Sequence, residues 1–137
     1  GLLTNAYSGP YYTSKFAAVG LTECLAHDLA ASGARIGVSV LVPSLVATNI
    51  GTSERNRGER FVDRSADGPG ADAEFVGQMI REATAGGMAP EAVADLVFDA
   101  VTAGRFYIPT QPSYHPQIAE RFAAMDALQL PPSPVLD

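Results

Sequence analysis

Tyr11 and Lys15, the only lysine of the sequence, stand four residues apart at the start of a long apolar stretch. Residues four apart share one face of an α-helix, so the phenol and the ammonium point into the same region of space. A nearby cation and the partial positive charge of a helix N-terminus both favour the charged form of a phenol. The pair is therefore suited to donate a proton to a substrate oxygen, or to accept one from it.

A helix and a strand must position this pair. Ser8-Gly9-Pro10 is typical of a helix entry and Ser32-Gly33 of a helix end, so we expect a helix from Pro10 to about Ala31. Its many apolar residues predict burial on more than one side. The continuous apolar run from Ile36 to Val42 predicts a strand covered on both faces. Residues 43–48 follow the C-terminal end of this strand. They therefore lie at the edge where ligands bind in open parallel sheets.

The order Tyr-x-x-Ser-Lys-Phe-Ala from Tyr11 to Ala17, followed by a helix, a glycine turn and an apolar strand, resembles the short-chain dehydrogenase/reductase family. In that family the tyrosine is the general acid/base and the lysine binds the nicotinamide ribose. The resemblance implies these roles for Tyr11 and Lys15, with NAD or NADP as the cofactor. The choice between the two cofactors stays open, because residues near the early strands set it in this fold.

The segment after the predicted strand resembles the family's Pro-Gly-x-Val-x-Thr segment, which passes the nicotinamide. The resemblance implies that the cofactor-binding residues are Tyr11, Lys15, Pro43, Ser44, Val46 and Thr48. One departure is that Ser44 stands where the family has glycine. Without the resemblance, Thr48 is better explained as a cap or turn residue before Asn49.

The resemblance covers the whole chain but only the second half of the family's fold. The Gly-rich turn that holds a dinucleotide pyrophosphate is absent, since neither Gly68-Pro69-Gly70 nor Gly86-Gly87 follows an apolar strand. The family's Asn-Asn-Ala-Gly strand end is absent too, and its catalytic serine falls upstream of Gly1. We therefore expect residues 1–137 to be the C-terminal part of a single doubly wound, Rossmann-like α/β domain. Its parallel sheet and flanking helices would continue in an N-terminal nucleotide-binding half outside this chain.

The apolar spacing is less regular between residues 49 and 89, where the family has its variable substrate-covering loop and helix region. Gly51 to Gly70 is polar and Gly-rich, so we expect a lid over the active site there. Four residues follow at helical spacing and line either a pocket or the core, with at least equal support for the core: Phe75, Val76, Met79 and Ile80. A helix from Pro90, a last strand from Arg105 to Thr110 and a helix from Pro116 complete the order. The last helix is expected to turn inward Ile118, Phe122, Met125 and Leu128.

Composition limits the function further. A net charge of -6 without a basic stripe argues against nucleic-acid binding. The 47% hydrophobic content of 137 residues predicts a folded domain, and no apolar run has transmembrane length. Cys24 allows no internal disulfide, which favours a cytoplasmic setting, and its place in the long helix predicts burial. His27 and His115 lack further ligands at metal spacing, so no metal site is expected.

These observations predict an NAD(P)-dependent oxidoreductase that moves a hydride between the nicotinamide and a small hydrophobic secondary alcohol or ketone. The small residues of the long helix, which the family commonly packs against its own copy, favour a homo-oligomer. Two alternatives stay open. One is a non-catalytic piece whose long helix and last strand serve subunit assembly. The other is an inactive relative that binds nucleotide as a sensor. The presence of both Tyr11 and Lys15 argues against this second alternative.

Overall fold

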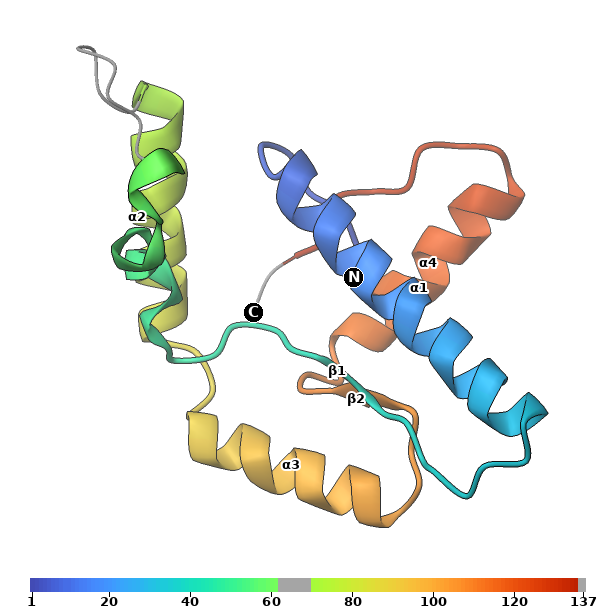
Figure 1. Ribbon diagram of the computed structural model, residues 1–137. Helices are drawn as coiled ribbons and strands as arrows, with labels where there is room; N and C mark the ends of the chain where they lie inside the picture. Colours follow the sequence, from blue (N-terminus) through green and yellow to red (C-terminus); the bar gives the residue numbers. More distant parts are fainter. Residues whose placement is uncertain (62–69, 136–137) are drawn as a thin grey trace. The chain divides into compact units, whose positions relative to one another are not determined.

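The computed structural model describes residues 1–61 and 70–135 (Figure 1). The chain forms two compact units, one of Gly1–Ser44 with Glu91–Asp137 and the other of Leu45–Pro90. Among the described residues, the first unit combines a parallel sheet with helices. The described residues of the second unit form helices and one isolated parallel bridge. The parallel sheet with flanking helices confirms the predicted α/β class.

The long helix α1 spans Gly9–Ala31, within one residue of the prediction. Pro10 lies in its first turn, where the N–H that proline lacks would have no partner within the helix. Gly33 follows the helix end with a φ of 71°, a left-handed conformation that favours glycine. Both ends of α1 are therefore set by residues next to them in the sequence.

The faces of α1 are less covered than predicted. Val19 is buried, whereas Leu21 is 72% and Leu25 48% exposed. Cys24 is exposed as well, so its predicted burial is wrong. The apolar residues of α1 lie on several of its faces, and the rest of the first unit covers only some of these faces. The prediction of burial on more than one side is therefore wrong within this chain.

The sheet of the described residues consists of two parallel strands, β1 at Val40–Val42 and β2 at Tyr107–Pro109. Val40 pairs with Tyr107 and Val42 with Pro109. Both strands are shorter than the predicted ranges 36–42 and 105–110, because a strand extends only where a neighbouring backbone shares its hydrogen bonds. Leu41 is 39% exposed. The prediction that both faces of β1 are covered is therefore also wrong within this chain.

The helix α3 spans Pro90–Thr102, as its proline, acidic first turn and apolar stripe predicted. Figure 1 shows α3 on one side of the two strands and α1 on the other. Val93 and Ala100 of α3 are buried, as are Ile108 of β2 and Val19 of α1. These side chains form the core of the first unit.

The last helix, α4, spans Tyr114–Asp126 and begins two residues before the predicted Pro116. The Arg121 guanidinium lies 5.1 Å from the centre of the Phe16 ring, so a cation–π contact joins α4 to α1. Three residues that were predicted to turn inward are exposed, namely Phe122, Met125 and Leu128. Their predicted orientation is wrong because no described element covers that side of α4.

A hydrogen bond between side chains also joins β2 to α1. The Tyr107 hydroxyl donates to Glu23 Oε1. This bond raises the pKa of Tyr107 above its usual range, and burial and the Glu23 charge contribute in the same direction.

We expect the first unit to lose stability at alkaline pH, because deprotonation of Tyr107 removes its hydrogen bond to Glu23. A tyrosine with a raised folded-state pKa contributes its full stability below the unfolded pKa of about 10. That contribution is lost as the pH rises through the folded pKa. Tyr107→Phe should therefore flatten the decline in the free energy of unfolding above about pH 10, measured by urea unfolding. Tyr7→Phe, at a tyrosine that is 78% exposed, is the control, and an unchanged decline in Tyr107→Phe would contradict the expectation.

The second unit packs the 3-10 helix η1, at Asn49–Asn56, against the helix α2, at Ala71–Ala85 (Figure 1). A shorter 3-10 helix, η2, spans Glu59–Phe61. The predicted lid falls on η1, on η2 and on residues 62–69, which lie outside the described residues. Three residues of the predicted stripe on α2 are exposed, at 65%, 43% and 37%: Phe75, Met79 and Ile80. The core alternative for this stripe is therefore wrong within this chain, and the pocket alternative stays a prediction.

No helix within residues 1–61 and 70–135 combines the length and the apolarity that crossing a membrane requires. In the same ranges, no three His, Cys, Asp or Glu side chains gather closely enough to hold a metal ion.

Candidate functional site

The structure brings Tyr11 and Lys15 together as their spacing predicted. Both belong to the N-terminal part of α1, and Lys15 Nζ lies 5.4 Å from the centre of the Tyr11 ring. At this distance a cation–π contact holds the two side chains on one face of the helix. The Tyr11 side chain is 51% exposed, so the phenol is accessible to a bound molecule.

Tyr12 has different surroundings from its neighbour. Its ring meets the Tyr11 ring edge-on, with the ring centres 5.5 Å apart. Burial raises the pKa of Tyr12 above its usual range, and the phenols of Tyr11 and Tyr114 add to this shift. A phenol that burial keeps neutral exchanges protons poorly near neutral pH. Of the two adjacent tyrosines, Tyr11 therefore has the more suitable surroundings for acid/base chemistry.

Ser44, the predicted departure from glycine, lies just after β1. Its backbone N–H donates to Oγ1 of the buried Thr110 at 2.9 Å. Its hydroxyl lies 2.8 Å from the hydroxyl of Tyr114, the first residue of α4. Ser44 therefore ties the carboxyl end of β1 to the start of α4. Neither partner was predicted from the sequence, in which the one signal was a serine at the family's glycine position.

We expect the Ser44 and Tyr114 hydroxyls to stabilise the fold as one unit. Ser44→Ala and Tyr114→Phe should each lower the free energy of unfolding by about 1 kcal/mol, because each removes the same hydrogen bond. The double variant should then lose less than the sum of the two single losses, because the shared hydrogen bond is lost only once. Urea unfolding of the four proteins measures this cycle, with Tyr7→Phe as the control for a lost phenol. Losses that add in the double variant would show that the two hydroxyls act independently.

Val46 and Thr48, the other predicted cofactor-binding residues, belong to the second unit. The chain around them runs beside Met88, with which Val46 forms a parallel bridge. The Met88 N–H donates to the Leu45 carbonyl and the Ala47 N–H to the Met88 carbonyl, both at 2.9 Å. These bonds fix the backbone on either side of Val46.

Gly87 allows this close approach of two backbone segments. A Cβ at position 87 would lie 2.7 Å from the Leu45 carbonyl oxygen and 2.8 Å from the Val46 nitrogen. These distances are too short for any side chain, so only glycine fits there. This role was not predicted, because the sequence of Gly86-Gly87 was compared only with a phosphate-binding turn, which it does not match. The signal was a pair of glycines directly after a helix.

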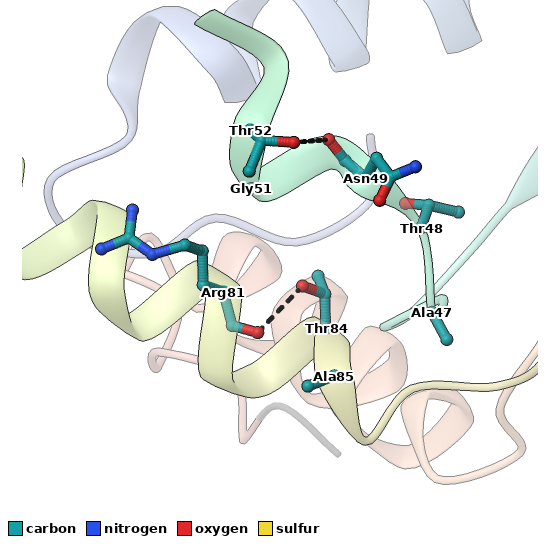
Figure 2. Close-up of a pocket in the computed structure, with 8 residues that line it drawn as sticks. All are labelled: Ala47, Thr48, Asn49, Gly51, Thr52, Arg81, Thr84 and Ala85. Atoms are coloured by element: carbon teal, nitrogen blue, oxygen red, sulfur yellow. Dashed lines mark hydrogen bonds between the residues drawn. The ribbon is translucent and has the colours of Figure 1, made fainter.

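Figure 2 shows a pocket between η1 and α2 in the second unit. Its volume is about 210 Å³, and it is lined by Ala47, Thr48, Asn49, Gly51, Thr52, Arg81, Thr84 and Ala85. Of the predicted cofactor-binding residues, Thr48 lines this pocket. Asn49 and Arg81 were not predicted as lining residues, because no spacing in the sequence relates a helical arginine to a segment more than 30 residues upstream.

Known proteins resemble this chain in both sequence and fold. Residues 1–59 match the family described as short chain dehydrogenase. A "CLA biosynthesis dehydrogenase/reductase" of Lactiplantibacillus plantarum is 34% identical over 122 residues, which cover 88% of this chain and 43% of that protein. The crystal structure of a short chain dehydrogenase/reductase from Burkholderia phymatum, in complex with NAD, is 32% identical with a TM-score of 0.91. That match covers 98% of this chain and 47% of the other. The chain thus spans less than half the length of either relative.

Proposed function

Because the chain belongs to the short-chain dehydrogenase/reductase family, we propose that the protein is an NAD(P)-dependent oxidoreductase acting on a secondary alcohol or ketone. The observation that carries this proposal is the Tyr11 and Lys15 pair. It lies on an accessible face at the start of α1, within the residues that match the family.

In this proposal Tyr11 is the general acid/base. A bound nicotinamide supplies or takes up the hydride. The Tyr11 hydroxyl donates a proton to the developing alkoxide during reduction and accepts one during oxidation. Lys15 Nζ binds the ribose hydroxyls and stabilises negative charge on the Tyr11 oxygen as the proton leaves. The 5.4 Å between Nζ and the ring centre supports this pairing.

We assign the cofactor contacts after β1 to Pro43, Ser44, Val46 and Thr48. They follow the carboxyl end of a parallel strand, which is where ligands bind in open sheets of this kind. The Ser44 N–H is already bonded to Thr110, so it is engaged within the protein. The Thr48 hydroxyl has no hydrogen-bond partner among the described residues, which makes it the more available donor. NAD in the Burkholderia phymatum relative supports NAD or NADP here.

Exposed apolar residues support a hydrophobic substrate and a homo-oligomer. Phe75 and Met79 give α2 an apolar face, at 65% and 43% exposure, that suits a hydrophobic alcohol or ketone. Leu21 and Leu25 on α1 are exposed in this chain and suit packing against a second copy.

Two measurements on the full-length protein test this function. The first is the fluorescence of NADH and NADPH on binding, for which we expect at least one cofactor to bind. The second is the consumption of that cofactor in the presence of hydrophobic ketones. A protein that binds neither reduced cofactor would overturn the proposal.

A further inference from the structure

Ser44 is held by two side chains that lie 66 and 70 residues further along the chain. Its backbone N–H donates to Thr110 Oγ1 at 2.9 Å, and its hydroxyl lies 2.8 Å from the Tyr114 hydroxyl. Separate hydrogen bonds therefore fix the backbone and the side chain of Ser44. All three residues belong to the first unit, as do Tyr11 and Lys15.

The bond to Thr110 continues the attachment of the chain beyond the end of the sheet. The pairing of β1 with β2 ends where Val42 meets Pro109, and proline has no N–H to donate. Thr110 follows directly, and its side chain supplies the acceptor for the next N–H on the β1 side. Thr110 is only 5% exposed, so water competes little for this hydrogen bond.

Tyr114 connects Ser44 to the helix that carries the catalytic pair. Burial raises the pKa of Tyr12 above its usual range, and the phenols of Tyr11 and Tyr114 add to the rise, so the Tyr114 phenol lies near α1. Further along α4, the Arg121 guanidinium lies 5.1 Å from the centre of the Phe16 ring, next to Lys15. The helix α4 is therefore joined both to Ser44 and to the N-terminal part of α1.

A cofactor that contacts both the catalytic pair and Ser44 needs the two in place at the same time. Its apparent affinity falls with the fraction of molecules in which they are in place. We propose that Thr110 and Tyr114 are positioning residues, which hold Ser44 where the nicotinamide cofactor binds, at a fixed place relative to the catalytic pair. The effect on the cofactor rests on the proposed function, whereas the hold on Ser44 rests on the hydrogen bonds alone.

Tyr114→Phe in the full-length protein removes the hydroxyl and keeps the ring. We expect the dissociation constant of NADH or NADPH, measured by nicotinamide fluorescence, to rise about 3- to 10-fold, as for the loss of one hydrogen bond. The KM for the cofactor should rise by the same factor and kcat should fall by less, because the Tyr11 hydroxyl is untouched. Tyr107→Phe is the control, since it loses a hydrogen bond of the same unit, to Glu23, and should leave the dissociation constant unchanged. An unchanged dissociation constant in Tyr114→Phe, or an equal rise in the control, overturns the proposal.

Thr110 is tested by a pair of variants that differ in the hydroxyl. Thr110→Val removes the acceptor and should raise the cofactor dissociation constant at least as much as Tyr114→Phe, because it leaves the Ser44 N–H without its partner. Thr110→Ser keeps the hydroxyl and should restore most of the affinity. An equal loss in the two variants would show that the hydroxyl of Thr110 does not position Ser44.

A double-mutant cycle shows whether Tyr114 acts through Ser44. Ser44→Ala removes the serine hydroxyl and keeps the N–H that donates to Thr110. The double variant Ser44→Ala with Tyr114→Phe should raise the dissociation constant by less than the product of the two single rises. A rise equal to that product would show that Tyr114 does not act through Ser44.

Amide hydrogen exchange of the Ser44 N–H, followed by NMR without cofactor, separates this proposal from the proposed function. We expect exchange about 3- to 10-fold faster in Tyr114→Phe than in Tyr107→Phe, because the loss of one hydrogen bond frees Ser44 to open locally. Equal exchange in the two variants overturns the hold on Ser44. Faster exchange with unchanged cofactor affinity overturns its role in cofactor binding. Faster exchange in a protein that binds neither NADH nor NADPH would overturn the proposed function and leave the hold on Ser44 standing.

Discussion

Tyr11→Phe is expected to lower kcat about 10²- to 10⁴-fold, because the variant keeps the ring and loses the proton that the hydroxyl exchanges with the substrate in the proposed reaction. The ring also keeps its cation–π contact with Lys15, so Lys15 should stay in place. We therefore expect the NADH or NADPH dissociation constant to change little. Steady-state kinetics and nicotinamide fluorescence on the full-length protein measure the two quantities separately.

Tyr12→Phe is the matched control for this variant. It removes the same hydroxyl from the adjacent residue, whose pKa is raised by burial. We expect Tyr12→Phe to retain near-normal kcat. Near-normal turnover in Tyr11→Phe, or an equal loss in the two variants, would show that Tyr11 is not the acid/base residue.

Lys15→Ala is expected to weaken NADH or NADPH binding about 10- to 100-fold, since it removes the proposed charge-assisted hydrogen bonds to the ribose. It should also lower kcat, because the positive charge 5.4 Å from the centre of the Tyr11 ring is lost. This double effect differs from that of Tyr11→Phe, which should change kcat alone. Titration of nicotinamide fluorescence together with single-turnover rates gives both values.

Lys15→Arg is the conservative variant for the same position. It keeps the charge on a longer side chain with a different shape. We expect part of the kcat to return and the cofactor affinity to recover less, because ribose binding depends on the position of the ammonium. If Lys15→Ala binds the cofactor as tightly as the unchanged protein, the ribose role of Lys15 is wrong.

The α-helices could be predicted from the sequence, whereas the 3-10 helices η1 and η2 could not. Pro10 and Gly33 mark the ends of α1, and Pro90 and Gly104 those of α3, within a residue or two of the observed bounds. These signals act within one turn of the chain, so they do not depend on the rest of the fold. The approach of Lys15 to Tyr11 was predictable for the same reason, because helix geometry alone sets it.

The lengths of the strands and the burial of the helices could not be predicted. Ile36 and Val38 suggested a longer β1, but the described pairing with β2 covers Val40–Val42. Leu21 and Leu25 suggested buried faces, yet they are exposed because the described part of the chain does not cover them. A strand needs a partner and an apolar side chain needs a neighbour. Neither is contained in the local pattern.

The sequence by itself therefore determined the α-helices, the α/β class and the Tyr11 and Lys15 pair, since each follows from residues a few positions apart. Only the tertiary structure decided that Ser44 bonds to Tyr114, 70 residues away, and that Arg81 lines a pocket with Thr48. Such contacts depend on the path of the folded backbone, including the close approach that Gly87 allows beside Leu45. That path results from many weak contacts acting together, and no single spacing in the sequence specifies it.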